Sequence, residues 1–220
     1  MKLWEMEALL SGLEGFDNPK IDLEQYPTSA HLASRVVDAA REDIEDLEVV
    51  DLGCGTGMLA AAALAIGAAH VVGVDVDHEA LAIAQRNVAA DFVLGDVRSL
   101  GFRPKSFDAC VMNPPFGTRT RGIDVVFLRT AVTLARRAVY SLHKTSTRDY
   151  LVGTAARDLG VSVEVIAKIR FDIPRLYKFH TQDSSDVEVD LLRFDPLQSP
   201  PCPLRRKRRD VARKERESKN

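Results

Sequence analysis

Short apolar runs alternate with helix-like stretches along the chain between residues 49 and 194. This alternation predicts β-α-β units, in which buried parallel strands are covered by helices on both faces of one sheet. The last run alternates apolar and polar positions instead, as expected of a half-buried antiparallel strand. We therefore predict an α/β fold with a mostly parallel, seven-stranded sheet. The expected strands are Val49–Leu52, Val71–Val76, Phe92–Leu94, Ala109–Met112, Val139–Leu142, Val161–Ile169 and Asp186–Phe194.

The helices are indicated by apolar positions spaced three and four residues apart. One helical pattern runs over Leu23–Ile44, with Thr28 as its expected N-cap, after the extended stretch around Pro27. Gly67 and Gly160 stand where two helices are expected to stop. The other predicted helices are Met58–Ile66, Glu79–Ala89 and Val125–Arg137.

The chain has 220 residues, of which 45% are hydrophobic and 28% charged, the balance of an ordinary globular protein with one core. Its net charge of −2 hides an asymmetry. Residues 201–220 carry nine Lys and Arg against three acids, whereas residues 1–200 carry 21 basic against 29 acidic side chains. We predict a domain over residues 1–196 and a disordered basic tail over 197–220, which either binds RNA phosphates or serves as a nuclear address.

Two classes of protein are disfavoured by the sequence. It has no run of roughly 20 apolar residues and its first residues lack the pattern of a secretory signal, so we expect an intracellular protein without a membrane partner. The cysteines Cys54, Cys110 and Cys202 form no C-x-x-C pair, which argues against a zinc site or a disulfide frame. We predict no metal, and we expect Cys54 and Cys110 to be buried.

A glycine-rich turn, Asp51-Leu52-Gly53-Cys54-Gly55-Thr56-Gly57, follows the first expected strand and opens a helix. In an open α/β sheet, a strand, a turn and a helix in this order form the crevice that binds a ligand. The spacing G-x-G-x-G differs from the G-x-G-x-x-G that places a pyrophosphate at a helix N-terminus. It favours a cofactor without phosphate, S-adenosylmethionine, packed closely against the glycine backbone.

Acidic residues end the next two expected strands. Asp75 stands at the distance along the chain at which a carboxylate accepts both hydroxyls of a cofactor ribose. Asp96 is placed to accept a hydrogen bond from an adenine amino group, while Val97 packs on the ring. One such acid alone often belongs to an ordinary turn. The ordered set behind the glycine turn indicates a class I, Rossmann-like S-adenosylmethionine-dependent methyltransferase.

The fourth expected strand ends in Asn113-Pro114-Pro115-Phe116, at the same edge of the sheet as the glycine turn. The Asn113 side-chain oxygen and the Pro114 carbonyl can accept the two N–H groups of a planar amino group and favour its transition state for methyl transfer. Proline fixes the backbone and offers no competing N–H. Phe116 offers a ring on which a flipped base can stack. The motif selects a planar nitrogen, but adenine N6, cytosine N4, guanine N2 and a glutamine amide all share that chemistry.

Basic and aromatic residues are interleaved after this loop and near the end of the domain, as in a groove that binds phosphates and stacks bases. Ordinary solvated loops with core aromatics explain the same pattern equally well. The residues concerned are Arg119, Arg121, His143, Lys144, Arg148 and the segment 168–180 with Phe171, Tyr177, Phe179 and His180.

Five motifs occur in one order along residues 1–195: Glu24-Gln25-Tyr26-Pro27-Thr28, Asp51-Leu52-Gly53-Cys54-Gly55, Asn113-Pro114-Pro115-Phe116-Gly117-Thr118, Tyr140-Ser141-Leu142-His143-Lys144 and Tyr177-Lys178-Phe179-His180. Together they closely resemble the methyltransferase-like protein five family, eukaryotic enzymes that make N6-methyladenosine in 18S ribosomal RNA. The resemblance implies catalysis by Asn113, Pro114, Pro115 and Phe116, and an obligate heterodimer with a small zinc-binding activator subunit shared among several methyltransferases. It implies a cofactor site formed by Gln25, Thr28, Gly53, Thr56, Met58, Asp75, Asp96 and Val97.

Two departures and two alternatives accompany this resemblance. Thr56 stands where many relatives have a cysteine, and residues 197–220 extend past the usual end of the family. The alternative functions are a protein glutamine N5-methyltransferase, which would use the same Asn-Pro-Pro loop, and a non-catalytic ribosome-assembly factor of the same fold. For an enzyme that modifies 18S ribosomal RNA we expect a location in the nucleus, including the nucleolus, and in the cytoplasm.

Overall fold

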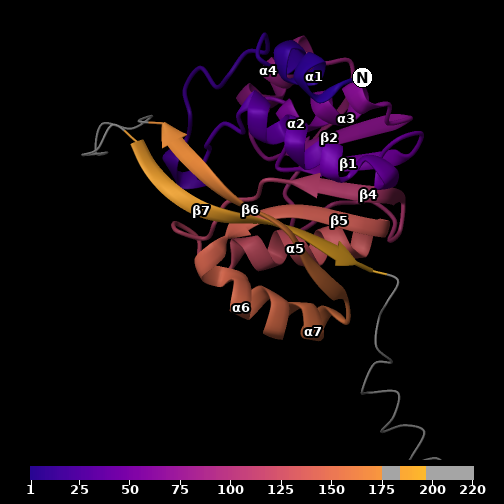
Figure 1. Cartoon of the computed structure of the whole chain (residues 1–220), viewed down its shortest axis with the longest axis vertical. Coiled ribbons are helices and arrows are strands. Elements are labelled where there is room, and N and C mark those ends of the chain that lie inside the picture. Colours follow the sequence, from indigo (N-terminus) through magenta and orange to yellow (C-terminus); the bar gives the residue numbers. More distant parts are fainter. Residues whose placement is uncertain (175–183, 197–220) are drawn as a thin grey trace, which may run out of the picture.

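The computed structural model describes residues 1–174 and 184–196, which form a sheet with helices on both faces (Figure 1). Its strands are β1 (Glu48–Leu52), β2 (His70–Asp75), β3 (Asp91–Leu94), β4 (Phe107–Met112), β5 (Ala135–Lys144), β6 (Ser162–Pro174) and β7 (Ser184–Asp195). The seven strands lie in the order β3-β2-β1-β4-β5-β7-β6. β1 to β5 run parallel, and β7 is antiparallel to both of its neighbours. The predicted fold class and the antiparallel last strand are confirmed.

The helices are α1 (Leu3–Leu10), α2 (Ala30–Ala39), α3 (Met58–Ile66), α4 (His78–Asn87), α5 (Ile123–Leu134), α6 (Arg148–Tyr150) and α7 (Ala156–Leu159). Two apolar clusters hold them on the sheet, because the central strands are buried on both faces. In β1, Val49 belongs to the cluster under α1–α3 and Val50 to the cluster under α5 and α7. Figure 1 shows these two helix groups on opposite sides of the sheet, and α4 packs over β2 and β3.

The helix predicted over Leu23–Ile44 is wrong in its bounds, because only α2 in its middle is α-helical. Short 3-10 turns, η1 (Ile21–Leu23) and η2 (Arg41–Asp43), lie on either side. The predicted N-cap Thr28 is also wrong, since the Ser29 hydroxyl accepts the Leu32 amide hydrogen instead. Thr28 lies before the helix, and its hydroxyl binds another loop.

Two helical segments lie where no helix was predicted. Helix α1 buries only Met6 and Leu10, so its apolar stripe is narrow. After β5, a 3-10 turn η3 (Thr145–Thr147), α6, a π-helical turn η4 (Leu151–Ala155) and α7 form one irregular connection to β6. The α3 prediction and the helix stops at Gly67 and Gly160, both of which have positive φ, are confirmed.

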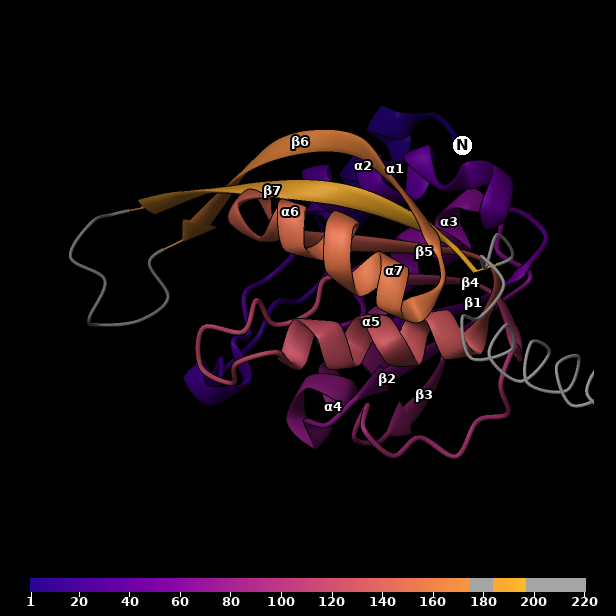
Figure 2. The same cartoon turned by 90° about the horizontal axis from the view of Figure 1, so that it is seen from below.

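The hairpin of β6 and β7 extends past the rest of the sheet. The two strands pair from Ser162 with Asp195 to Pro174 with Ser184, whereas β7 pairs with β5 only as far as Val189 opposite Lys144. The outer part of the hairpin therefore projects beyond the carboxyl end of β5, as Figure 2 shows. This end of the sheet is the one at which the cofactor crevice was expected.

Cys54 and Cys110 are both buried, as predicted, and burial raises the pKa of each thiol. Cys202 and the basic tail lie outside the described residues. No helix within residues 1–174 or 184–196 is long and apolar enough to cross a bilayer.

Gly73 in β2 sets how closely β3 and the glycine turn approach each other. A Cβ atom there would lie 2.6 Å from Phe92 Cε1 and 3.0 Å from Cys54 Sγ. We expect Gly73→Ala to lower the free energy of unfolding by about 1–3 kcal/mol, because the two side chains must move. Thermal unfolding measures this loss. Gly101→Ala is the control, since a Cβ there meets nothing within 4 Å; equal stability of the two variants would contradict the packing argument.

Candidate active site

A cavity of about 190 Å³ opens at the carboxyl ends of the parallel strands. The glycine turn after β1, the acids after β2 and β3 and the loop after β4 all contribute to its wall. The N-terminal segment before α2 forms another side of it. Its lining residues are Phe16, Asp22, Leu23, Glu24, Gln25, Tyr26, Leu52, Gly53, Gly55, Val74, Asp75, Val76, Gly95, Asp96, Val97, Arg98, Asn113, Pro115, Thr120, Ile123 and Phe127.

The glycine turn has to be glycine because two aromatic rings press on it. Gly53 and Gly55 have φ of 71° and 53°, and a Cβ would lie 2.9 Å from Phe127 and 2.8 Å from Phe16, respectively. A side chain at either position would be strained and would collide with a ring. The bare backbone therefore faces the cavity.

Beneath this turn, the buried carboxylate of Asp51 accepts the Ala60 amide hydrogen through Oδ2, at 3.0 Å. Its Oδ1 is buried without a hydrogen-bond partner in the described structure. Desolvation raises the pKa of Asp51 from 3.8 to about 8. The residue thus sits protonated at neutral pH directly behind the glycine turn.

Asp75 joins the glycine turn to the end of β2. Its Oδ2 accepts the Gly55 amide hydrogen at 2.8 Å and its Oδ1 accepts that of Asp77 at 2.9 Å. Burial raises the pKa of Asp75 above its ordinary value. A carboxylate has about four acceptor positions, so these two bonds leave it able to accept ribose hydroxyls.

Asp96 and Val97 follow β3 and line the same cavity. Asp96 accepts the Arg98 amide hydrogen and forms an ion pair with its guanidinium at 3.0 Å. Hydrogen bonds from the Arg98 backbone and side chain hold the pKa of Asp96 below its ordinary value. It therefore stays ionised, with acceptor positions left that could bind an amino group.

The loop predicted to be catalytic, Asn113–Phe116, is fixed by a contact with the segment before α2. Asn113 Nδ2 donates to Thr28 Oγ1 at 3.0 Å, which turns the Asn113 oxygen to the opposite side of the amide. Asn113 and Pro115 line the cavity, whereas Pro114 and Phe116 do not: Pro114 is buried, and Phe116 is half-buried against the apolar cluster under α1–α3. The Lys144 ammonium lies 5.8 Å from the centre of the Phe116 ring.

Several predicted cofactor residues have other contacts. Gln25 lines the cavity, but its amide bridges the Lys20 backbone and Asp77, at 2.7 Å each. Thr56, which is buried, does not line the cavity, and neither do Thr28 and Met58. A cofactor contact by these three residues stays a prediction.

Glu24 and the rings of Phe16, Tyr26 and Phe127 lie in the cavity wall, although the sequence did not predict them there. Glu24 is a buried carboxylate that accepts the backbone amides of Phe116 and Arg119. Glu24 belongs to the first of the five family motifs, but no local pattern indicates a partner about 90 residues away. Only the fold brings these parts together.

The prediction that His143 belongs to a basic groove is wrong. His143 is 1% exposed, bonded to the Ser141 hydroxyl, and burial lowers its pKa to about 4, so it is neutral and cannot contact RNA. Arg148 is ion-paired with the buried Asp190. Arg119, Arg121 and Lys168 are exposed. The side chain of Phe171 and residues Tyr177, Phe179 and His180 lie outside what the structure describes.

Comparison with known proteins gives this geometry a family context. A methyltransferase domain model matches residues 49–137. The chain is 47% identical to the rRNA N(6)-adenosine-methyltransferase METTL5 of Danio rerio, over 89% of the chain and 100% of the relative. It is 46% identical to the protein of that name from Drosophila melanogaster, over 89% and 97%. A candidate RNA methyltransferase from Pyrococcus horikoshii superposes with a TM-score of 0.80 at 34% identity, over 89% and 98%.

The buried Asp51 makes stability depend on pH. Because its pKa is raised from 3.8 to about 8 in the folded chain, the folded state keeps a proton that the unfolded state has lost between these values. The free energy of unfolding therefore falls as the pH rises through this window. The side chain of Asp51→Asn cannot ionise. Between pH 5 and pH 8.5 the free energy of unfolding of this variant should therefore rise by at least about 1 kcal/mol relative to that of the native chain, given about 1.4 kcal/mol per pKa unit.

Calorimetric unfolding at both pH values measures this gain. Asp108→Asn is the control, because the pKa of Asp108, which is ion-paired with Arg136, is lowered in the folded chain. The difference in free energy of unfolding between Asp108→Asn and the native chain should be the same at pH 5 and pH 8.5. If this difference were also independent of pH for Asp51→Asn, the Asp51 carboxyl would not be protonated in the folded chain.

Proposed function

The chain belongs to the family of rRNA N6-adenosine methyltransferases, and from this premise we propose that its target is an adenosine of 18S ribosomal RNA. The activity is the transfer of a methyl group from S-adenosylmethionine to the N6 amino group of an adenosine in ribosomal RNA. The observation that supports this chemistry is that Asn113 and the glycine turn line the same cavity.

The cavity suits a cationic cofactor. Of its charged lining residues, four are acids and one is a base: Asp22, Glu24, Asp75, Asp96 and Arg98. Such a wall repels a pyrophosphate and attracts a sulfonium. Gly53 and Gly55 would hold the amino-acid part, Asp75 the ribose, and Asp96 with Val97 the adenine. When bound, S-adenosylmethionine supplies an activated methyl group.

The chain itself must make the adenine amino group nucleophilic. Its lone pair is delocalised into the ring, so the two N–H bonds have to be held in a geometry that favours a tetrahedral nitrogen. The Asn113 oxygen, set by Thr28, and the Pro114 carbonyl can accept these two hydrogens. No strong base is required, because the methylated ammonium loses a proton readily to water, and alignment accounts for most of the rate.

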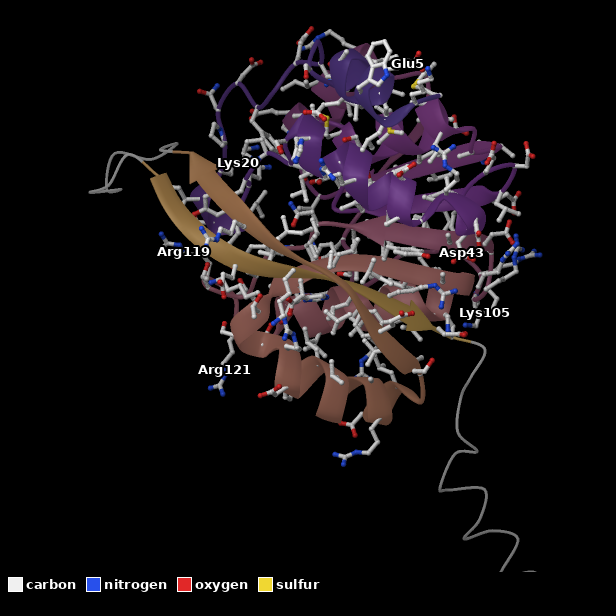
Figure 3. All side chains as sticks on the ribbon, in the orientation of Figure 1. Glu5, Lys20, Asp43, Lys105, Arg119 and Arg121 are labelled. Atoms are coloured by element: carbon white, nitrogen blue, oxygen red, sulfur yellow. The ribbon has the colours of Figure 1, made fainter. Side chains whose placement is uncertain are left out.

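The surface around the catalytic loop suits RNA better than a peptide. Arg119 and Arg121 follow the loop, and Figure 3 shows both at the end of the molecule that also holds Lys20. Lys144 lies against Phe116, so a base stacked on this ring would have its phosphate near a cation. Lys168 adds a positive charge on β6, one strand of the projecting hairpin.

We also propose that the edge strand β3 receives the zinc-binding activator subunit. β3 ends the sheet, and its Val93 and Leu94 are 37% and 60% exposed, beside Val76 at 52%. An open strand edge with apolar side chains favours pairing with another chain. A location in the nucleus, including the nucleolus, and in the cytoplasm is proposed on the target RNA and on the basic cluster at 205–209.

The function is tested by replacing Asn113 in cells. Asn113→Ala should lower the methyl-transfer rate at least about 100-fold with little change in cofactor affinity, because the lost acceptor acts on the transition state. Mass spectrometry of nucleosides should then find N6-methyladenosine lost from 18S ribosomal RNA. Thr28→Val, which leaves Asn113 less fixed, should cost about 10-fold. Thr133→Val removes a hydroxyl far from the cavity and should have no effect; an active Asn113→Ala protein would refute the mechanism.

The partner surface is tested by placing a charge on β3. Leu94→Arg should abolish co-purification of the activator and lower the yield of folded chain, because an apolar contact is replaced by a buried charge. Leu9→Arg is the matched control, since Leu9 is a comparably exposed leucine on α1, at 48%. Retention of the activator by both variants would show that another surface binds it.

A further inference from the structure

Glu24 is a buried carboxylate with both oxygens directed at the catalytic loop. Its Oε2 accepts the Phe116 amide hydrogen at 3.0 Å, and its Oε1 accepts the Arg119 amide hydrogen at 2.8 Å. The residue is only 9% exposed. Burying a carboxylate is costly unless hydrogen bonds satisfy it, and these two amides satisfy one oxygen each.

The loop offers few other points at which it can be held. Pro114 and Pro115 have no N–H, so Phe116 carries the first backbone donor after Asn113. The chain then turns at Gly117, with φ of 76°, which brings the Arg119 amide toward the same acceptor. One carboxylate therefore closes the turn that begins directly after the catalytic residues.

The backbone of Glu24 shows that this position is imposed by its surroundings. It adopts φ of 52° and ψ of 41°, a left-handed conformation that non-glycine residues rarely take. The Glu24 amide donates to the Ile21 carbonyl, and the next residue, Gln25, binds Asp77 at the start of α4. Adjacent residues thus tie the cofactor side of the cavity to the catalytic loop.

We propose that Glu24 is a positioning residue for methyl transfer: it fixes the Phe116–Arg119 turn, and through it the Pro114 carbonyl and the Phe116 ring that receive the target base. The role rests on the proposed function, because it concerns the placing of a nucleobase. A carboxylate is required since two N–H groups need two acceptor oxygens in one plane. An amide has a single acceptor and would point its NH₂ at one of the donors.

The test uses the full-length protein with its activator subunit and 18S ribosomal RNA from cells that lack this protein. Glu24→Gln should lower the single-turnover rate at saturating RNA and cofactor at least tenfold. Cofactor affinity, measured by calorimetry, should fall by a clearly smaller factor, because Glu24 is one of four acids in the cavity wall. Glu24→Asp keeps both oxygens on a shorter chain and should recover part of the rate. In isotope-labelled protein, the amide proton resonances of Phe116 and Arg119 should shift upfield in Glu24→Gln.

Asp43→Asn is the matched control for lost stability. Asp43 is 7% exposed and binds Tyr140 and Arg193, at the far end of the molecule from Arg119 (Figure 3). The Asp43→Asn substitution should lower the melting temperature and leave the single-turnover rate within twofold of the native value. A native rate in Glu24→Gln, or a rate loss matched by an equal loss of cofactor affinity, would overturn the proposal.

A measurement on the native chain separates this proposal from the function on which it rests. The Phe116 and Arg119 amide hydrogens should exchange slowly with solvent, because the buried carboxylate holds them. Fast exchange would refute the proposal that Glu24 fixes the Phe116–Arg119 turn, even if every variant failed to fold. A native complex that transfers no methyl group, although both amides are protected, would instead refute the proposed function. The hydrogen bonds of Glu24 to the turn would then be a feature of the fold alone.

Discussion

The parallel pairing of β1 with β4 is the constraint on which the site depends. Asp51 lies level with Val111, so Gly53 and Asn113, two residues further along each strand, reach the same edge of the sheet together. Parallel strands end on one side, and the loops that follow them must share it. The cofactor turn and the catalytic loop are therefore brought together by sheet register, before any side chain between them is considered.

The parts that could be predicted from the sequence are those with a local signal. The parallel strands, the glycine turn and the Asn113 loop all carry periodicity or turn residues. The contacts of Thr28 with Asn113 and of Glu24 with Phe116 join residues 85 and 92 positions apart, and no nearby pattern indicates them. His143 was misread for a related reason: β5 is buried on both faces, so its polar residues do not alternate with apolar ones.

The segment before α2 is where the common fold becomes a particular active site. Glu14 is held by Arg86 and Asn87, Lys20 by Asp77, and Thr28 by Asn113, so the segment spans the cavity with ties to both walls. None of these bonds belongs to the sheet. Most are exposed or half-exposed and contribute little stability singly. Their common effect is geometric, since they decide where the cofactor wall ends and the nucleobase site begins.

The strand order also governs how the polypeptide is completed during synthesis. β7 is the last strand made, yet it lies inside the sheet, between β5 and β6. Its Leu191 and Leu192 belong to the two opposite apolar clusters. Until residue 195 has left the ribosome, β6 has no neighbour and one flank of β5 stays open. A premature stop before residue 184 would thus remove an internal strand, leaving two further exposed edges and half-built cores for chaperones and proteases to recognise.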